Sequence, residues 1–186
     1  MIFSLFSRRR EPVFQRLYGE IVSQARLPVF YRQYRVPDTV EGRFEMILIH
    51  LIVLFKRCEG ESRETLAEAQ KVLDHFFMEM DKSIREMGVG DVTVPKKMRK
   101  LGEAYAGRAA AYGPALAAGD AGQLVQALAR NVYHGIDDNS AAAPLATYVF
   151  SAYDALKAVP AGDILANRIP WPVPANLDAG EGVSQS

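Results

Sequence analysis

The residues whose types and spacing could carry chemistry are few, and most lie between positions 50 and 100. His75 and Glu79 are four residues apart, which puts both on one face of a helix and suits a metal ion, but no second pair stands at ligand spacing. We therefore expect a solvent-facing pair. Cys58 has no activating partner near it in the sequence, as nucleophilic catalysis would require. The GVGD at 88–91 lacks both the third glycine of a dinucleotide loop and the Gly-Lys-Ser/Thr of a P-loop.

The remaining histidines and a pair of aspartates do not indicate an enzyme either. His50 interrupts an apolar run and is expected to be a core histidine with one hydrogen-bond partner. His134 falls at the end of a predicted helix, where a positive charge is favoured. Asp137 and Asp138 resemble the acidic box of helical prenyl-transferring enzymes, but the repeated aspartate three positions on is absent. The sequence predicts no catalytic residue, no metal site and no cofactor.

Four cations in the first turns of a predicted helix do call for an explanation, because the helix dipole disfavours positive charge there. A partner surface that carries phosphates or carboxylates would compensate for it. Three arginines upstream could join these cations in one patch, although a solvated face of lysines is the alternative. The residues are Lys96, Lys97, Arg99 and Lys100, with Arg26, Arg32 and Arg35. Residues 1–100 carry 18 Lys and Arg against 14 Asp and Glu, and residues 101–186 carry 4 against 8.

The element that must position these residues is the segment from Glu41 to Arg57. Nine of the ten residues from Met46 to Phe55 are apolar. An apolar surface on every side is typical of a helix buried in a domain, and the run is about half the length that a bilayer requires. A short buried strand is the competing interpretation, but amphipathic helical segments elsewhere favour a central helix.

Helical periodicity recurs along most of the chain, and no internal repeat or hairpin signal is present. The segment 28–37 is expected to be an extended connection with its aromatic side chains on the core, and Asp38 or Thr39 is expected to cap the central helix. The class is all-α, with a single domain of about six helices. The other helices are predicted over 12–25, 62–87, from 95 to a bend or an end at Gly113-Pro114, over 121–133, and from 144 onward.

Length and composition divide the chain into one domain and two tails. We expect a flexible basic N-terminus at 1–11, a helical domain at 12–159 and a Pro/Gly-rich extended tail at 160–186, docked through Trp171. The single cysteine among 186 residues suits a reducing compartment. The first residues place apolar side chains before Arg8, Arg9 and Arg10, the reverse of a secretory signal, so we expect a cytoplasmic protein. This terminus either frays or rests on an anionic membrane.

Three segments in order resemble the ubiquinol-cytochrome c chaperone family, over roughly Tyr18 to Asn131. They are IVSQARLPVFYRQYRVPDTVEGRFEMILIHL, DHFFMEMDKSIREMGVGDVTVPKKMRKL and EAYAGRAAAY. The middle segment is similar to the family's most recognisable block. The resemblance implies an all-helical protein that is not an enzyme and that binds newly made cytochrome b before it joins the bc1 complex. In mitochondria the family works with a second small assembly factor and near the translating ribosome.

This chain lacks the long targeting segment of the mitochondrial members, so we expect a bacterial-type homologue, peripheral at the cytoplasmic face of the inner membrane. Cytochrome b is the expected client, with the ribosome or an anionic membrane surface as further partners, and no DNA or small-molecule substrate. The alternative is a helical RNA- or ribosome-binding module that uses the same cations. An enzyme with a helical ligand cavity would instead require a large apolar pocket.

The predicted partner surface centres on the turn that joins two long helices. Glycines there permit backbone turns, cations meet acidic or lipid-phosphate groups, and aromatic and methionine side chains cover apolar client surface. The alternative for Arg43, Asp81 and Arg85 is that they form internal ion pairs. The predicted residues are Arg43, Asp81, Arg85, Glu86, Gly88, Gly90, Asp91, Pro95, Lys96, Lys97, Tyr105, Arg108 and Tyr112.

Overall fold

The structure, a computed structural model, describes residues 11–134, 139–166 and 168–177, and every regular element in these ranges is helical. The all-α prediction is confirmed. Six longer helices match the expected number, and two short helices and a 3-10 turn are added to them. The elements are α1 Val13–Ala25, α2 Pro28–Arg32, α3 Val40–Cys58, α4 Arg63–Glu86, α5 Val94–Ala118, α6 Ala121–Asn131, the 3-10 turn Asn139–Ala141, α7 Ala142–Lys157 and α8 Ala161–Ala166.

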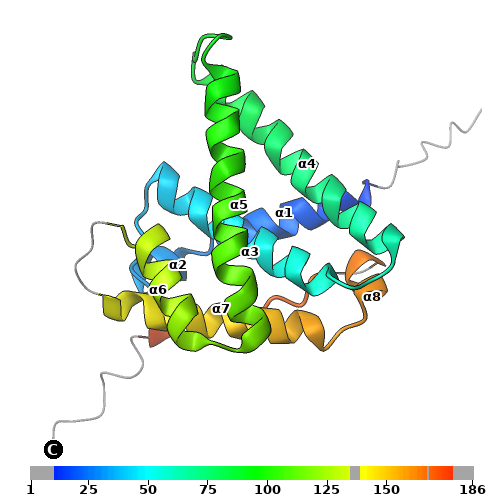
Figure 1. Cartoon of the computed structure of the whole chain (residues 1–186), viewed down its shortest axis with the longest axis vertical. Helices are drawn as coiled ribbons and strands as arrows, with labels where there is room; N and C mark the ends of the chain where they lie inside the picture. The colour runs from blue at the N-terminus through cyan, green and yellow to red at the C-terminus, as the bar shows by residue number, and fades with distance from the viewer. Residues whose placement is uncertain (1–10, 135–138, 167, 178–186) are drawn as a thin grey trace, which may run out of the picture.

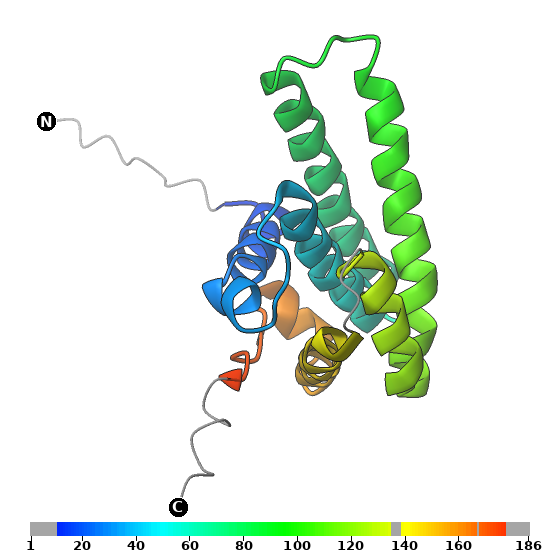
Figure 2. The same cartoon turned by 90° about the vertical axis from the view of Figure 1, so that its left-hand side faces the viewer.

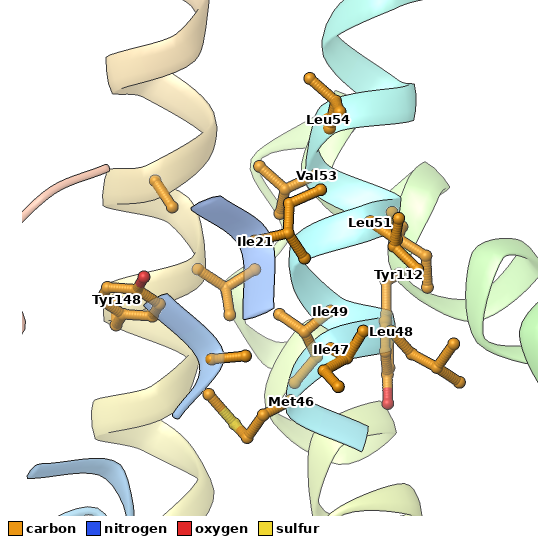
Figure 3. Close-up of a cluster of buried hydrophobic side chains, with 14 of the residues drawn as sticks. Ile21, Met46, Ile47, Leu48, Ile49, Leu51, Val53, Leu54, Tyr112 and Tyr148 are labelled. Carbon is orange, nitrogen blue, oxygen red and sulfur yellow. The ribbon is translucent and has the colours of Figure 1, made fainter. Parts of the chain in front are cut away.

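Helix α3 lies at the centre, as its composition predicts. It packs against α1, α4, α5 and α7, and every residue from Met46 to Leu54 is buried. Figure 3 shows the result, with Tyr148 of α7 on one side of α3 and Tyr112 of α5 on the other. Thr39 begins the helix by accepting a hydrogen bond from the amide of Gly42 at 3.1 Å.

The start of α3 depends on a glycine. The backbone of Pro37 passes so close to Gly42 that a β-carbon there would overlap the carbonyl oxygen of Pro37. The chain that leads into α3 can therefore fold back tightly on its first turn only because position 42 has no side chain.

Helices α4 and α5 form an antiparallel hairpin whose joining loop projects beyond the other helices in both views (Figures 1 and 2). Ser62 begins α4 by accepting from the amide of Thr65 at 3.2 Å. The long α4 is confirmed. Helix α5 runs through Pro114 to Ala118, so an end at Gly113-Pro114 is wrong, and Gly119 ends the helix with a φ of 67°.

The segment after α1 differs from the prediction. Residues 28–32 form the short helix α2 where an extended connection was expected, because Pro28 occupies the first helical position, where its missing N–H costs nothing. The aromatic side chains still pack inward as predicted. Phe30 and Tyr34 are buried in the main core.

The tail beyond Pro160 begins with α8, which the Pro/Gly-rich composition did not indicate, and then returns to the body. The amide of Ile169 donates to a carboxylate oxygen of Glu20 at 2.7 Å. The indole of Trp171 lies edge-on to His50 with ring centroids 4.9 Å apart. The predicted docking through Trp171 is thus confirmed for residues 168–177.

Some expectations concern residues outside the described ranges. They are the N-terminal residues 1–10, the aspartates Asp137 and Asp138, and the last part of the tail at 178–186. Among the helices that the structure describes, none is both long and apolar enough to cross a membrane.

Candidate functional site

The end of the α4–α5 hairpin, residues 81–100, brings together most of the predicted partner residues, and we call it the hairpin tip. Its loop is built by a glycine and a turn. Gly88 ends α4 with a φ of 77°, a conformation that favours glycine. The amide of Thr93 then donates to the carbonyl of Gly90 at 2.8 Å, which turns the chain into α5. Gly90 itself does not have a positive φ.

One arginine fastens the loop of the hairpin tip to α4. Nε of Arg85 donates to Asp81 at 2.6 Å, and Nη1 donates to Asp91 at 2.7 Å. The planar guanidinium fits two carboxylates at once. Arg85 and Asp81 therefore pair with each other within the chain, which was the alternative to partner contact. Asp91 of the loop pairs with the same guanidinium, and all three side chains stay exposed.

The cations of α5 are paired differently. Arg99 lies 3.6 Å from the carboxylate of Glu103. No carboxylate of the described residues lies within ion-pair distance of Lys96, Lys97 or Lys100, and all three are exposed. Their charge lies in the first turns of α5, where the helix dipole opposes it. The structure thus leaves three ammonium groups without compensation at one end of the molecule.

Large apolar side chains are also exposed at this end. Val92 in the loop is 95% exposed, and Met87 at the end of α4 is 65% exposed. Met78 lies further down α4 and is 54% exposed. Ile84 and Val94 are buried near the loop but lie outside the main core cluster. The hairpin tip combines exposed apolar and cationic side chains on a small, separately packed projection.

Nine predicted residues belong to the hairpin tip. Glu86 lies 4.0 Å from Lys82, one turn earlier on the same face of α4, and Pro95 occupies an early helical position of α5. Val92, the most exposed large apolar side chain of the hairpin tip, is not among the predicted residues, because a single valine in a Gly-rich loop has no periodicity. The nine are Asp81, Arg85, Glu86, Gly88, Gly90, Asp91, Pro95, Lys96 and Lys97.

Arg43 lies apart from the hairpin tip. It pairs with Asp38 at 2.7 Å and stands over the ring of Tyr31, and it lines a hollow of about 380 Å³ together with Arg26 and Arg32. Both views place α2, and with it this hollow, well below the end of the hairpin (Figures 1 and 2). The arginines of this region therefore do not form one patch with the lysines of α5.

Tyr112 is an interior residue of the α3–α5 contact, and Arg108 on the same helix is partly buried, with its side chain 24% exposed. Nε of Arg108 donates to both carboxylate oxygens of Glu45, at 3.1 and 3.0 Å. Burial raises the pKa of Glu45, and the Arg108 guanidinium opposes that rise. Tyr112 is 1% exposed, so its inclusion in a partner surface is wrong: α5 turns this face toward α3.

Tyr105 is half-buried in an aromatic cluster. Its ring centroid lies 6.3 Å from those of Phe55 and Phe77, in edge-to-face geometry. Burial raises its pKa to about 12, so the hydroxyl stays protonated. Tyr105 therefore fixes α5 against α3 and α4, some turns below the hairpin tip.

His50 is a hydrogen-bonded core residue, as predicted. Burial lowers its pKa to about 4, so the ring is neutral. Its Nδ1–H donates to the carbonyl of Met46 at 2.7 Å, and the hydroxyl of Tyr148 donates to Nε2 at 2.8 Å. The amide of Gln24 donates to the same hydroxyl at 2.9 Å. This network connects α1, α3 and α7.

The other candidates for chemistry are also structural. Burial raises the pKa of Cys58 to about 11, so its thiol is a poor nucleophile. His75 packs between the rings of Phe14 and Tyr18, at 5.4 and 5.0 Å, so the expected solvent-facing position is wrong. No group of three metal-ligating side chains occurs within 11–134, 139–166 and 168–177.

Comparisons with known proteins agree with this architecture. The family model for the ubiquinol-cytochrome C chaperone matches residues 32–171. The crystal structure of the Cbp3 homolog from Brucella abortus is similar at a TM-score of 0.79 and 39% sequence identity, over 89% of this chain and 90% of that chain. A search of curated proteins gives no match.

Proposed function

Because the chain belongs to the ubiquinol-cytochrome C chaperone family, we propose that it binds newly made cytochrome b and assists assembly of the bc1 complex. It acts by binding and not by catalysis. The contact is the hairpin tip, and the observation that carries this assignment is the exposure of Val92 and Met87 beside three uncompensated lysines.

The chemistry of the hairpin tip suits a membrane-protein client. Segments of such a client that are not yet packed present apolar side chains, and the loops between them present charge. A flexible methionine adapts to varied apolar surfaces, which a chaperone contact requires. Lysines on a projecting helix end contact acidic groups without a fixed geometry. We place the working location at the cytoplasmic face of the inner membrane, where cytochrome b is inserted.

Site-specific crosslinking tests the contact. A photoreactive amino acid is placed at position 92 and, as a matched control, at position 173. Both positions hold a valine in a non-helical segment, and the exposed fractions are 95% and 91%. In cells that make cytochrome b, we expect a cytochrome b adduct from position 92 and little from position 173. Equal adducts at both positions, or none at 92, would contradict the proposal.

A second candidate function is an RNA- or ribosome-binding module, favoured by the three uncompensated lysines. Its contact would be phosphate, and its affinity would fall steeply with added salt. This function predicts that the protein cosediments with ribosomes whichever chain they translate, and that replacing Lys96 and Lys97 by glutamine abolishes the cosedimentation. Cosedimentation only with ribosomes that translate cytochrome b would instead support the client contact.

A further inference from the structure

We propose that the hairpin tip docks on an anionic membrane surface, with Val92 and Met87 entering the interface and Lys96, Lys97 and Lys100 on the lipid headgroups. This inference rests on the proposed function and deepens it, since it names the surface on which the client is met. Its evidence is the arrangement of the hairpin tip itself.

The hairpin tip projects from the molecule, so it can contact a flat surface without hindrance from the other helices. The loop between α4 and α5 stands clear of the other helices in both views (Figures 1 and 2). Val92, at 95% exposed, lies in this loop, and Met87 flanks it. An apolar side chain at the end of a projection enters the interfacial layer without any change in the fold.

The lysines lie at the depth that headgroups would occupy. A helix rises about 1.5 Å per residue, so Lys100 is roughly 9 Å below the start of α5, and Lys96 and Lys97 are closer to it. The headgroup layer is about 5–8 Å thick, and a lysine extends its ammonium group along its own stem toward that layer. All three ammonium groups reach the phosphates when Val92 stands at the edge of the hydrocarbon.

The acidic residues of the tip do not cancel this charge. Asp91 is held by Arg85 at 2.7 Å, and Glu86 faces Lys82 at 4.0 Å. Anionic headgroups also supply what the start of α5 lacks, namely negative charge near its free amides. Two apolar side chains and a cluster of lysines supply both contributions to interfacial binding, namely buried apolar area and attraction to anionic lipids.

Cosedimentation with vesicles tests the proposal on the full chain without cytochrome b. We expect binding to vesicles of phosphatidylcholine with phosphatidylglycerol and not to phosphatidylcholine alone. The variant K96Q/K97Q/K100Q should bind on the order of 100-fold more weakly, because each lysine near an anionic surface contributes about fivefold. The variant M87S/V92S should bind roughly tenfold more weakly.

A matched control removes the same number of positive charges elsewhere. The variant R63Q/K71Q/K157Q changes exposed cations at the far end of α4 and on α7, and should bind vesicles like the parent. If the control loses affinity as much as the tip variant, net charge and not the tip is responsible, and the proposal is overturned.

A second control addresses the basic N-terminus. The variant R8Q/R9Q/R10Q should keep most of the vesicle affinity. If this variant alone abolishes binding, the membrane contact belongs to the N-terminus and the tip proposal fails. Binding of the lysines to ribosomal RNA with no vesicle binding by the parent would also overturn it. The vesicle assay contains no cytochrome b, so the two proposals can fail separately. Absence of vesicle binding would overturn the membrane contact only, and absence of a cytochrome b adduct at position 92 would overturn the client contact only.

Discussion

Replacement of Arg108 by methionine separates a structural role of this arginine from a role in partner contact. Arg108 was expected at the partner surface, whereas the structure pairs it with Glu45, whose side chain is 8% exposed. Methionine keeps most of the apolar stem but leaves the carboxylate buried between α3 and α5 without its cation. The loss of one partner from a buried ion pair costs about 3–5 kcal/mol of folding free energy.

The cost depends on pH, and its upper limit follows from the pKa of Glu45. Burial already raises this pKa above its ordinary value of 4.5, and removal of the guanidinium raises it further. The folded state then binds a proton that the unfolded state releases, so stability falls as pH rises. Keeping the Glu45 carboxyl protonated costs about 1.4 kcal/mol for each pH unit above its ordinary pKa, which is about 4 kcal/mol at about pH 7.5. The variant can always protonate Glu45 instead of burying an unpaired charge, so its loss of folding free energy cannot exceed this value.

Urea unfolding of the parent and R108M at several pH values measures this effect. We expect the variant to be about 3–4 kcal/mol less stable at about pH 7.5, and the gap to narrow by about 2 kcal/mol at about pH 5.5. E45Q/R108M should recover part of the loss and show little pH dependence. R43M, which breaks the exposed pair with Asp38, is the control and should unfold close to the parent. A gap that does not change with pH would refute the reasoning.

Two further predictions concern the core. Y148F removes the hydroxyl that donates to Nε2 of His50, so we expect a loss of about 1–3 kcal/mol in urea unfolding for a buried acceptor left unsatisfied, and an unchanged stability would contradict the network. G42A places a methyl group against the carbonyl of Pro37 and should lower stability by about 3 kcal/mol. The control G107A, with open space around its helical position, should leave stability unchanged or raise it by up to about 1 kcal/mol, and similar losses in both variants would argue against the close approach at position 42.

The sequence predicts the elements that local periodicity determines. The apolar run in α3 and the amphipathic stripe along α4 lie where expected, and the left-handed glycines Gly88 and Gly119 follow the ends of α4 and α5. Each signal lies within the element that it describes. Elements held by tertiary contacts were missed, since α2 and α8 are too short to show a period, and α8 precedes a tail that docks through Glu20.

The candidate site divides in the same way. The turn chemistry of 88–95 is local, and the structure builds the hairpin tip from it. The partners of Arg108 and the depth of Tyr112 depend on how α5 packs on α3, and residues 45 and 108 are 63 positions apart. A sequence pattern does not show which carboxylate a distant arginine will pair with, or how deeply a tyrosine will be buried. Both residues were therefore assigned to the partner surface.

The positive charges near the hairpin are therefore used in two ways. Arg85 and Arg108 are held by carboxylates, and the fixed fork of a guanidinium suits such pairs, in which geometry is retained. Lys96, Lys97 and Lys100 have no such partner among the described residues, and their flexible ammonium groups suit a diffuse anionic surface. The two arginines pair within the chain, Arg85 with the loop and Arg108 with α3. Because Val92 and Met87 are exposed at the outer end of the hairpin, the lysines beside them are placed to contact the anionic surface that the loop reaches.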